Sequence, residues 1–252
     1  MSKKAMILAA GFGTRLKPWT DAHPKALVPV DGIPMLERVI CRLKDEGFYH
    51  IVINIHHFGE QILEFLDSKD FGVSISVSDE STGILDTGGG IVGASSLLSV
   101  EDDEPFLVHN VDILSDAPLA SLLQQNAESD NDVTLLTSGR ESSRKLVFDD
   151  KGSLKGWHRQ EPDQWRPEKM VHKEGDMENA FAGIYVMNGK ALRSMEDYSD
   201  KTGNRKFPVM DYLLSLPEDV KIGQYFIAKL NLIDIGKPET LKAASGFLAS
   251  IR

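Results

Sequence analysis

The segment LAAGFGTRLKPWTDAHPKAL, residues 8–27, carries the end of an apolar strand into a loop that holds two glycines, an arginine and a lysine. Glycine lets a backbone turn sharply and approach a ligand closely, so a glycine-rich turn after a strand exposes N–H groups that favour an anion. The spacing of Gly11 and Gly13 does not fit the P-loop, and Leu16 stands where the dinucleotide fingerprint needs its third glycine. Pro18 disfavours a long helix directly afterwards. The sequence therefore predicts a long, cation-bearing loop that binds an anion.

Beyond this loop, short apolar runs alternate with amphipathic helical patterns as far as about residue 138. Strands of about four to eight residues that alternate with helices are typical of right-handed βαβ crossovers. We therefore predict an α/β fold with a mostly parallel central sheet and helices on both faces. The expected strands lie at 5–10, 50–55, 73–78, 105–114 and 132–138, and the expected helices at 35–47, 57–68, 88–98 and 118–129.

The pattern changes after residue 138, where strand-like runs are separated by turns, and this predicts a smaller mixed β region beside the parallel sheet. The polar segment 158–177 follows Trp157 and contains Trp165. Long segments of this kind are either disordered insertions or lids over a ligand, and the two tryptophans favour a lid. The expected strands lie at 144–150, 151–157, 179–187 and 220–235, and the expected helices at 191–197, 208–216 and 238–251.

The composition is that of an ordinary globular chain of 252 residues, of which 41% are hydrophobic. The formal net charge of −10 opposes general binding to nucleic acids or anionic membranes, and no lysine- and arginine-rich stripe overrides it. The single cysteine, Cys41, excludes an intrachain disulfide, suits a reducing compartment and is expected in the core because it lies in the apolar pattern LERVICRL. The chain has no run of 18 apolar residues, so we expect a cytoplasmic protein.

Two aspartates follow expected strands, at the place where open α/β sheets bind their ligands. Asp112 comes after PFLVHNV, and Asp234 closes KLNLI. If they converge, they offer hard oxygen donors to Mg²⁺, whose other positions phosphate and water would fill; alternatively, each aspartate simply caps the following turn. Arg15 and Lys25 could clamp two phosphates, although each alone is typical of a solvated surface residue. The combination of Arg15 and Lys25 with the exposed N–H groups of the glycine loop favours a specific anion-binding site.

A second glycine cluster lies in LDTGGGIVGASSLL, residues 85–98, directly before an expected helix. Bare backbone at Gly88 and Gly89 could receive a nucleobase or a sugar, or the stretch could be only a tight loop at a helix start. His56 and His57 follow a strand, and neighbouring strand residues point to opposite faces, so we treat them as structural rather than as a joint metal site.

These segments together resemble the sugar-1-phosphate nucleotidyltransferases. GFGTRLKP, residues 11–18, is similar to the family signature G-x-G-T-R-L-x-P, and the Pro-Lys pair of HPKAL follows it. LDTGGGI is similar to the family's base loop, VDI and LIDIGKPE to its two metal-binding segments, and AFAGIYVM to its sugar-facing strand. The resemblance spans essentially the whole chain. It implies a Rossmann-like nucleotidyltransferase fold and an enzyme that converts an NTP and a sugar 1-phosphate into an NDP-sugar and pyrophosphate.

The resemblance also implies roles for the residues that match it. Arg15, Lys25 and Asp112 are the expected catalytic residues, and Mg²⁺ is the expected cofactor. The triphosphate is expected to contact Ala10, Gly11, Gly13 and Thr14, with its β/γ end at Arg15. Lys25 is expected to contact the α-phosphate or the sugar phosphate. The base is expected at Gly88 and Gly89, Mg²⁺ at Asp112 and Asp234, and the sugar at Asn179 and Gly183.

The resemblance further implies a single domain over residues 1–252, with a nucleotide-binding half at 1–138 and a sugar-phosphate-binding half at 139–252 that ends in a helix. The expected partners are an NTP and a sugar 1-phosphate, without nucleic acid or membrane. A homo-oligomer is left open, and the sequence fixes neither the base nor the sugar.

Two features depart from the family pattern. Val111 stands where most members have glycine before the aspartate, and the usual Glu-Lys-Pro element has no clear counterpart, since the Glu161–Pro162 pair lacks the lysine. The sugar contacts are therefore the least defined part of the resemblance. The TGGG form of the base loop and the lack of a C-terminal acyltransferase repeat are similar to short members that act on N-acetylmuramate, mannose or heptose 1-phosphates.

Two other functions stay open at this point. A cytidylyltransferase for a non-sugar phosphate such as phosphocholine would need an aromatic cage, for which Trp157, Trp165 and Tyr185 are candidates. A nucleotide-sensing homologue without turnover would be expected to lack one of the metal aspartates, and both are present.

Overall fold

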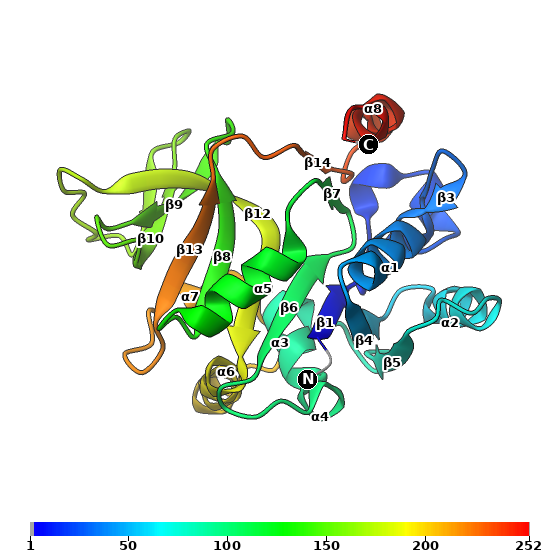
Figure 1. The fold of residues 1–252 in the computed structure, drawn as a ribbon, viewed down its shortest axis with the longest axis horizontal. Helices are drawn as coiled ribbons and strands as arrows, with labels where there is room; N and C mark the ends of the chain where they lie inside the picture. The colour runs from blue at the N-terminus through cyan, green and yellow to red at the C-terminus, as the bar shows by residue number, and fades with distance from the viewer. Residues whose placement is uncertain (1–2, 252) are drawn as a thin grey trace.

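A mixed β-sheet runs through the centre of the molecule (Figure 1). The computed structural model describes residues 3–251. The parallel part of the sheet consists of β1 (Lys3–Leu8), β4 (Phe48–Ile55), β5 (Ser74–Asp79) and β6 (Pro105–Asn110). β1 lies between β4 and β6 and is parallel to both, and β5 extends this part along β4. The carboxyl ends of β1 and β6 therefore lie side by side.

The strand β12 connects this parallel part to the second half of the chain. The remaining strands of the sheet are β8 (Val133–Ser138), β9 (Arg144–Phe148), β10 (Leu154–Arg159), β11 (Gln164–Arg166), β12 (Met177–Asn188) and β13 (Ile222–Ile227). β12 is antiparallel to β6, β8 and β9, whereas β13 is parallel to β8. The predicted α/β fold, mostly parallel with a mixed region in the second half, is confirmed.

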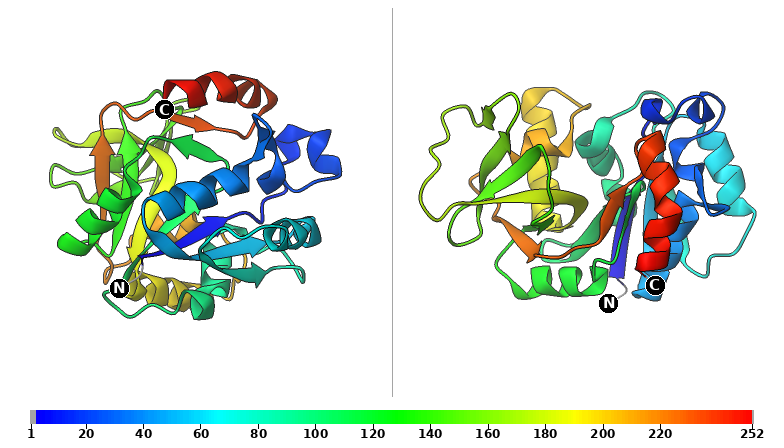
Figure 2. Two further views of the ribbon diagram at one scale, coloured as in Figure 1. Left: turned by 45° about the vertical axis from the view of Figure 1, so that its right-hand side comes forward. Right: turned by 90° about the horizontal axis from the view of Figure 1, so that it is seen from above.

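Helices cover both faces of the sheet. The helices are α1 (Met35–Asp45), α2 (Gly59–Asp67), α3 (Asp86–Gly93), α4 (Ser95–Leu98), α5 (Leu119–Glu128), α6 (Gly189–Thr202), α7 (Val209–Leu213) and α8 (Pro238–Ser250). One core cluster joins the sheet to α1, α2 and α5, and a second joins its other face to α3, α4, α6 and α7. The right-hand view of Figure 2 separates these layers, with α5 on one side of the sheet and α3 and α6 on the other. No helix within residues 3–251 is long and apolar enough to cross a membrane.

The expectation that Cys41 lies in the core is wrong. Its thiol is exposed on α1, although Ile40 beside it is fully buried. Leu36, Val39, Ile40 and Leu43 form the buried stripe of this helix. Since each helical residue turns by about 100°, the residue after Ile40 leaves that stripe.

The loop after β1 contains no long helix, as Pro18 predicted. It makes three short 3₁₀ turns and a small hairpin, namely η1 (Thr14–Leu16), η2 (Trp19–Asp21), η3 (Lys25–Leu27), β2 (Pro29–Val30) and β3 (Ile33–Pro34). Its apolar side chains, Leu16 and Val28 among them, form a third core cluster with Ile235 and with Ala244 of α8. The loop is therefore held between α8 and the ribbon formed by β7 (Ile113–Ser115) and β14 (Leu232–Asp234).

The polar segment 158–177 is not a disordered insertion. β11 pairs antiparallel with β10, and the ring of Trp165 stacks on His158 with centroids 3.7 Å apart. The segment thus extends the sheet beyond β9, at the left of Figure 1. Its action as a lid stays a prediction.

Candidate active site

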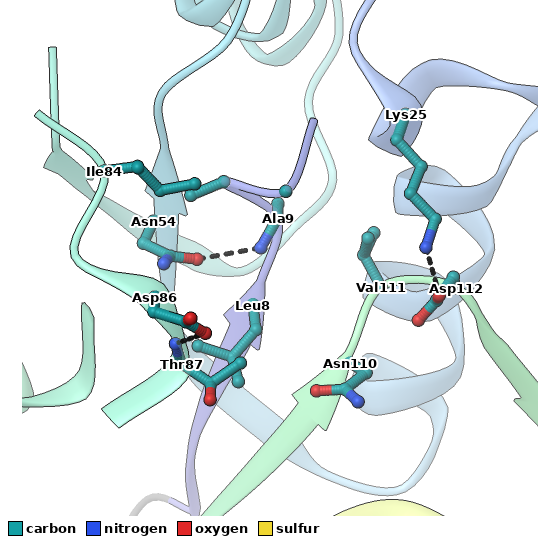
Figure 3. A pocket seen from close by; sticks show the side chains of 12 residues that line it. Leu8, Ala9, Lys25, Asn54, Ile84, Asp86, Thr87, Asn110, Val111 and Asp112 are labelled. Atoms are coloured by element: carbon teal, nitrogen blue, oxygen red, sulfur yellow. Dashed lines mark hydrogen bonds and ion pairs between the residues drawn. The ribbon is translucent and has the colours of Figure 1, made fainter. Parts of the chain in front are cut away.

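A cavity of about 200 Å³ opens at the carboxyl ends of β1 and β6. Figure 3 shows its two walls: Asn54, Asp86 and Thr87 lie on one side, and Lys25 and Asp112 on the other. The residues that line it are Leu8, Ala9, Ala10, Gly11, Lys25, Asn54, Ile84, Asp86, Thr87, Asn110, Val111 and Asp112. The cavity therefore lies where the doubly wound fold is expected to bind a ligand.

The first glycines of the loop have different structural roles. A Cβ built on Gly11 would have no neighbour within 4 Å, so this residue offers open backbone to the cavity. Gly13 has a φ of 64°, and a Cβ there would lie 2.7 Å from the Cβ of Lys25. Thr20 fixes the turn by donating from its hydroxyl to the Gly13 carbonyl at 2.9 Å. Gly13 therefore lets the loop fold back so that Lys25 reaches the cavity.

Two predicted side chains, Lys25 and Asp112, form an ion pair across the edge of the cavity. Each side chain is 13% exposed, and Figure 3 shows the ammonium group of Lys25 directed at the carboxylate. Their partly buried position limits screening by solvent and salt, so the two charges attract each other strongly and the ammonium group of Lys25 is held at the cavity edge.

Asp234 joins this pair through the ribbon of β7 and β14. Asp234 is opposite Ile113 in the ribbon, and the N–H of Ile235 donates to the Asp112 carbonyl at 2.8 Å. Although Asp234 reaches the surface, desolvation by the surrounding protein raises the pKa of its carboxyl group, and the nearby carboxylate of Asp112 raises it further. The two aspartates that we expected to converge therefore lie close enough to repel each other.

Arg15 approaches the same place from the loop. A Cβ built on Gly236 would lie 2.5 Å from Nη2 of Arg15 and 2.7 Å from Oδ1 of Asp234, so both side chains lie over this glycine. The site thus combines two cations with two carboxylates beside an open glycine backbone. Thr14 also belongs to this loop, at the start of η1, but it is exposed and does not line the cavity.

The carboxylates of the site suit a magnesium ion whose shell phosphate and water complete, rather than a metal held by protein side chains alone. Within residues 3–251, no cluster of three or more histidine, cysteine, aspartate or glutamate side chains could hold a metal. Mg²⁺ needs only one or two carboxylates when phosphate and water complete its shell. Asp112 and Asp234 provide such a pair, and a divalent cation would relieve their repulsion.

A buried hydrogen-bond chain that the sequence analysis missed holds the opposite wall. Asn54 accepts from the N–H of Ala9 at 2.8 Å and donates to Glu80 at 2.7 Å, and Glu80 also accepts from the N–H of Leu85 at 2.8 Å. Asn54 and Glu80 are each 2% exposed. The only sequence signal was a polar residue inside the apolar run HIVINI, and its partners, Ala9 and Glu80, directly follow two other strands, β1 and β5.

The glycine cluster of α3 is placed differently from the prediction. Gly88, Gly89 and Gly90 lie inside the helix and are buried, rather than preceding it. The N–H groups of Gly88 and Gly89 both donate to the carbonyl of Phe207, at 2.9 and 3.2 Å. The structure therefore uses these glycines for close packing, and the cavity is lined instead by Ile84, Asp86 and Thr87 from this segment.

Only one of the two expected sugar contacts lies near the cavity. Gly183 has a φ of 73° at an irregularity of β12, and a Cβ there would lie 2.9 Å from Nδ2 of Asn110 in the cavity wall. Asn179 instead donates its amide to Gln224 at 2.9 Å and does not line the cavity. The structure brings Gly183 to the site and leaves Asn179 in the sheet beside β9.

The chain is similar in sequence to known proteins. A family model described as nucleotidyl transferase matches residues 4–250. A protein of Neisseria meningitidis serogroup B named N-acetylmuramate alpha-1-phosphate uridylyltransferase is 47% identical over 122 residues, which cover 48% of this chain and 52% of that protein. A protein of Oryza sativa subsp. japonica named probable mannose-1-phosphate guanylyltransferase 1 is 34% identical over 204 residues, which cover 77% of this chain and 52% of that one. The chain thus spans about half the length of these curated relatives.

Solved structures show the same fold. HddC from Yersinia pseudotuberculosis, complexed with GMP-PN, aligns with a TM-score of 0.74 and 22% identity over 98% of this chain and 99% of its own. A UDP-glucose pyrophosphorylase complexed with UDP-glucose aligns with a TM-score of 0.74 and 19% identity over 100% of both chains.

Proposed function

The chain belongs to the nucleotidyl transferase family, and from this premise we propose that it transfers a nucleotidyl group from an NTP to a sugar 1-phosphate and releases pyrophosphate. The observation that carries the proposal is the convergence of Arg15, Lys25, Asp112 and Asp234 beside the open backbone of Gly11.

The reaction joins one anion to another. A phosphate oxygen of the sugar 1-phosphate attacks the α-phosphorus of the NTP, an O–P bond forms, and the bond to the β-phosphate breaks so that pyrophosphate leaves with the electron pair. The attacking oxygen already carries negative charge near neutral pH, since the second pKa of a phosphate monoester is about 6, so no general base is needed. The site must instead cancel repulsion and align the reactants.

The side chains of the site match these needs. Lys25 is held at the cavity edge by Asp112, where its ammonium group can offset repulsion between the α-phosphate and the incoming sugar phosphate. Arg15 lies in the glycine loop and presents a planar fork to the departing pyrophosphate. Asp112 and Asp234 would hold Mg²⁺, which when bound neutralises phosphate oxygens and contributes several kcal/mol of charge stabilisation.

The structure does not favour phosphocholine as the acceptor. Tyr185 is buried in the core at 1% exposure, and one face of Trp165 is covered by His158. Trp157 lines a surface hollow together with Arg140 and Arg144, whose charges would repel a choline group. The three aromatic residues therefore form no common cage.

Pyrophosphate release tests the proposal. The protein is incubated with Mg²⁺, each of the four NTPs and a panel of sugar 1-phosphates that includes N-acetylmuramate 1-phosphate and mannose 1-phosphate, with reactions lacking acceptor as the background. At least one pair should release pyrophosphate and yield the matching NDP-sugar. A protein that binds an NTP but stays at background with every acceptor would be a sensor rather than an enzyme.

A further inference from the structure

A second hollow of about 290 Å³ lies in the second half of the chain. Arg140, Arg144, Lys145, Trp157, Phe181 and Met210 contribute to its lining, and we call it the cationic hollow. Its walls come from β9, β10, β12 and α7, and from the segment that follows β8, so it belongs to the mixed part of the sheet.

Two contacts connect the cationic hollow with the walls of the active-site cavity. Thr87, which lines the cavity, accepts from the N–H of Val209 at 2.8 Å, and Val209 directly precedes Met210 in α7. Phe181 in the hollow lies two residues before Gly183, which packs against Asn110 in the cavity wall. The hollow is therefore built on elements that pack directly against the walls of the cavity.

The electric charge of the hollow is positive although the whole chain has a net charge of −10. No carboxylate lines it, and within residues 3–251 none of Arg140, Arg144 and Lys145 forms an ion pair with an acidic side chain. An adjacent hollow shares Arg144 and Trp157 and adds Arg159 and Arg166. Of these two further cations, Arg166 pairs with Asp211 at 3.3 Å.

Arg140 is held in position but incompletely bonded. Its Nη2 donates to the carbonyl of Phe181 at 2.8 Å, whereas its Nε is buried without a partner. A partly buried guanidinium group is costly unless an anion or further acceptors satisfy it. The missing partner, the neighbouring unpaired cations and the contacts with the cavity walls point to a negatively charged ligand group.

We propose, resting on the proposed function, that the acceptor sugar carries a second anionic group besides its 1-phosphate, a carboxylate or another phosphate, and that Arg140, Arg144 and Lys145 bind it. Trp157 lines the hollow together with these cations and offers an apolar surface to the sugar ring. Because the triphosphate is expected at Arg15 and Lys25, the hollow selects the acceptor and not the NTP.

The test uses two pairs of acceptors in which one member carries a second anion. N-acetylmuramate 1-phosphate is compared with N-acetylglucosamine 1-phosphate, which lacks the lactyl ether that bears the carboxylate, and glucose 1,6-bisphosphate with glucose 1-phosphate. The measured quantity is the ratio of kcat/KM within each pair, from pyrophosphate release. We expect at least about a tenfold preference for the acceptor with the second anion in one pair, and which pair shows it distinguishes a carboxylate from a phosphate.

Variants of the hollow test whether its cations cause the preference for the acceptor with the second anion. Arg140→Met and Lys145→Met should each reduce the preference to within about threefold of unity, mainly by raising KM for the anionic acceptor. Lys151→Met removes an exposed cation from the β9–β10 turn outside the hollow and should keep the wild-type ratio. Thermal melting confirms that each variant is folded.

Three outcomes would overturn the inference. Wild-type protein that uses sugar 1-phosphates but shows equal efficiency within both pairs contradicts this inference alone and leaves the proposed function standing. The same holds if Arg140→Met and Lys145→Met keep the preference or lower kcat/KM equally for both members of a pair. Failure of every acceptor with every NTP contradicts the proposed function together with this inference.

Discussion

At the scale of single residues, the proposed function gives Lys25 the most specific task, because its charge would offset repulsion between two phosphates. It reaches the cavity only because Gly13 adopts a left-handed conformation in contact with its side chain. The sequence motif predicted that these residues act together, but the ion pair with Asp112 required the fold.

Lys25→Met should lower kcat for pyrophosphate release by about 10²-fold or more, since it removes a preorganised cation from the reacting phosphates. Lys17→Met serves as the matched control, because Lys17 lies in the same loop but is exposed and forms an ion pair with Asp21 on the surface. A Lys25→Met enzyme with turnover close to that of the control would remove Lys25 from the mechanism.

Asn54 is a residue whose importance only the structure reveals. Asn54→Leu should lower the free energy of unfolding by about 2–4 kcal/mol, because the N–H of Ala9 and the carboxylate of Glu80 both lose a buried partner. Chemical denaturation measures the change, and Gln160→Leu, at an exposed position, is the control. An unchanged midpoint for Asn54→Leu would mean that water replaces both bonds.

At the scale of elements, α3 shows a limit of sequence patterns. A helix over 88–98 was predicted, but glycine is a poor helix former, and the pattern does not explain three consecutive glycines there. The structure explains two of them, because contacts of Gly88 with Phe207 and of Gly89 with Arg205, far along the chain, leave no room for side chains. By contrast, the strands before residue 138 were predictable because their apolar runs are local.

Gly89→Ala should destabilise the fold by about 1–3 kcal/mol despite the better helix propensity of alanine, because the new methyl group would collide with the backbone carbonyl of Arg205. Gly93→Ala is the control in the same helix: its Cβ would meet only the end of the Leu85 side chain, at 3.0 Å, which can move. Thermal melting should therefore separate the two variants. Equal melting temperatures would contradict close packing as the reason for the glycines.

The β10–β11 hairpin should respond to pH through His158. Burial by itself lowers the pKa of this histidine, but hydrogen bonds to Glu178 and Asp163, together with their charges, outweigh it and raise the pKa above its ordinary value. A raised folded-state pKa stabilises the protein fully below the unfolded value of about 6.5, and this contribution is lost as the pH rises through the folded-state pKa.

His158→Gln should therefore lower the melting temperature more at pH 5.5 than at pH 8.5. Scans of wild-type and variant protein at both pH values measure the difference. A larger loss at pH 8.5 would show that the charged form of His158 contributes nothing to the hairpin.

At the scale of the whole molecule, the site forms only when segments that are distant in the sequence pack together. Two core clusters bring together the glycine loop, the end of β6 and the β7–β14 ribbon, so that Asp112 and Asp234 meet although much of the chain separates them. The sequence predicted both aspartates from their positions after strands. Neither the strand order, in which β12 pairs with both β6 and β8, nor the cationic hollow could be predicted, because both depend on packing between distant segments.

The most direct test of the central claim measures pyrophosphate release, with Mg²⁺ and the best substrate pair, by wild-type protein and by Asp112→Asn, Asp234→Asn and Asp103→Asn, the last in an exposed loop. We predict that the first two variants lose about 10²-fold or more in kcat and stay folded, while Asp103→Asn keeps wild-type activity. Asp112→Asn and Asp234→Asn enzymes that turn over at the wild-type rate would contradict the claim that these two carboxylates form the catalytic centre.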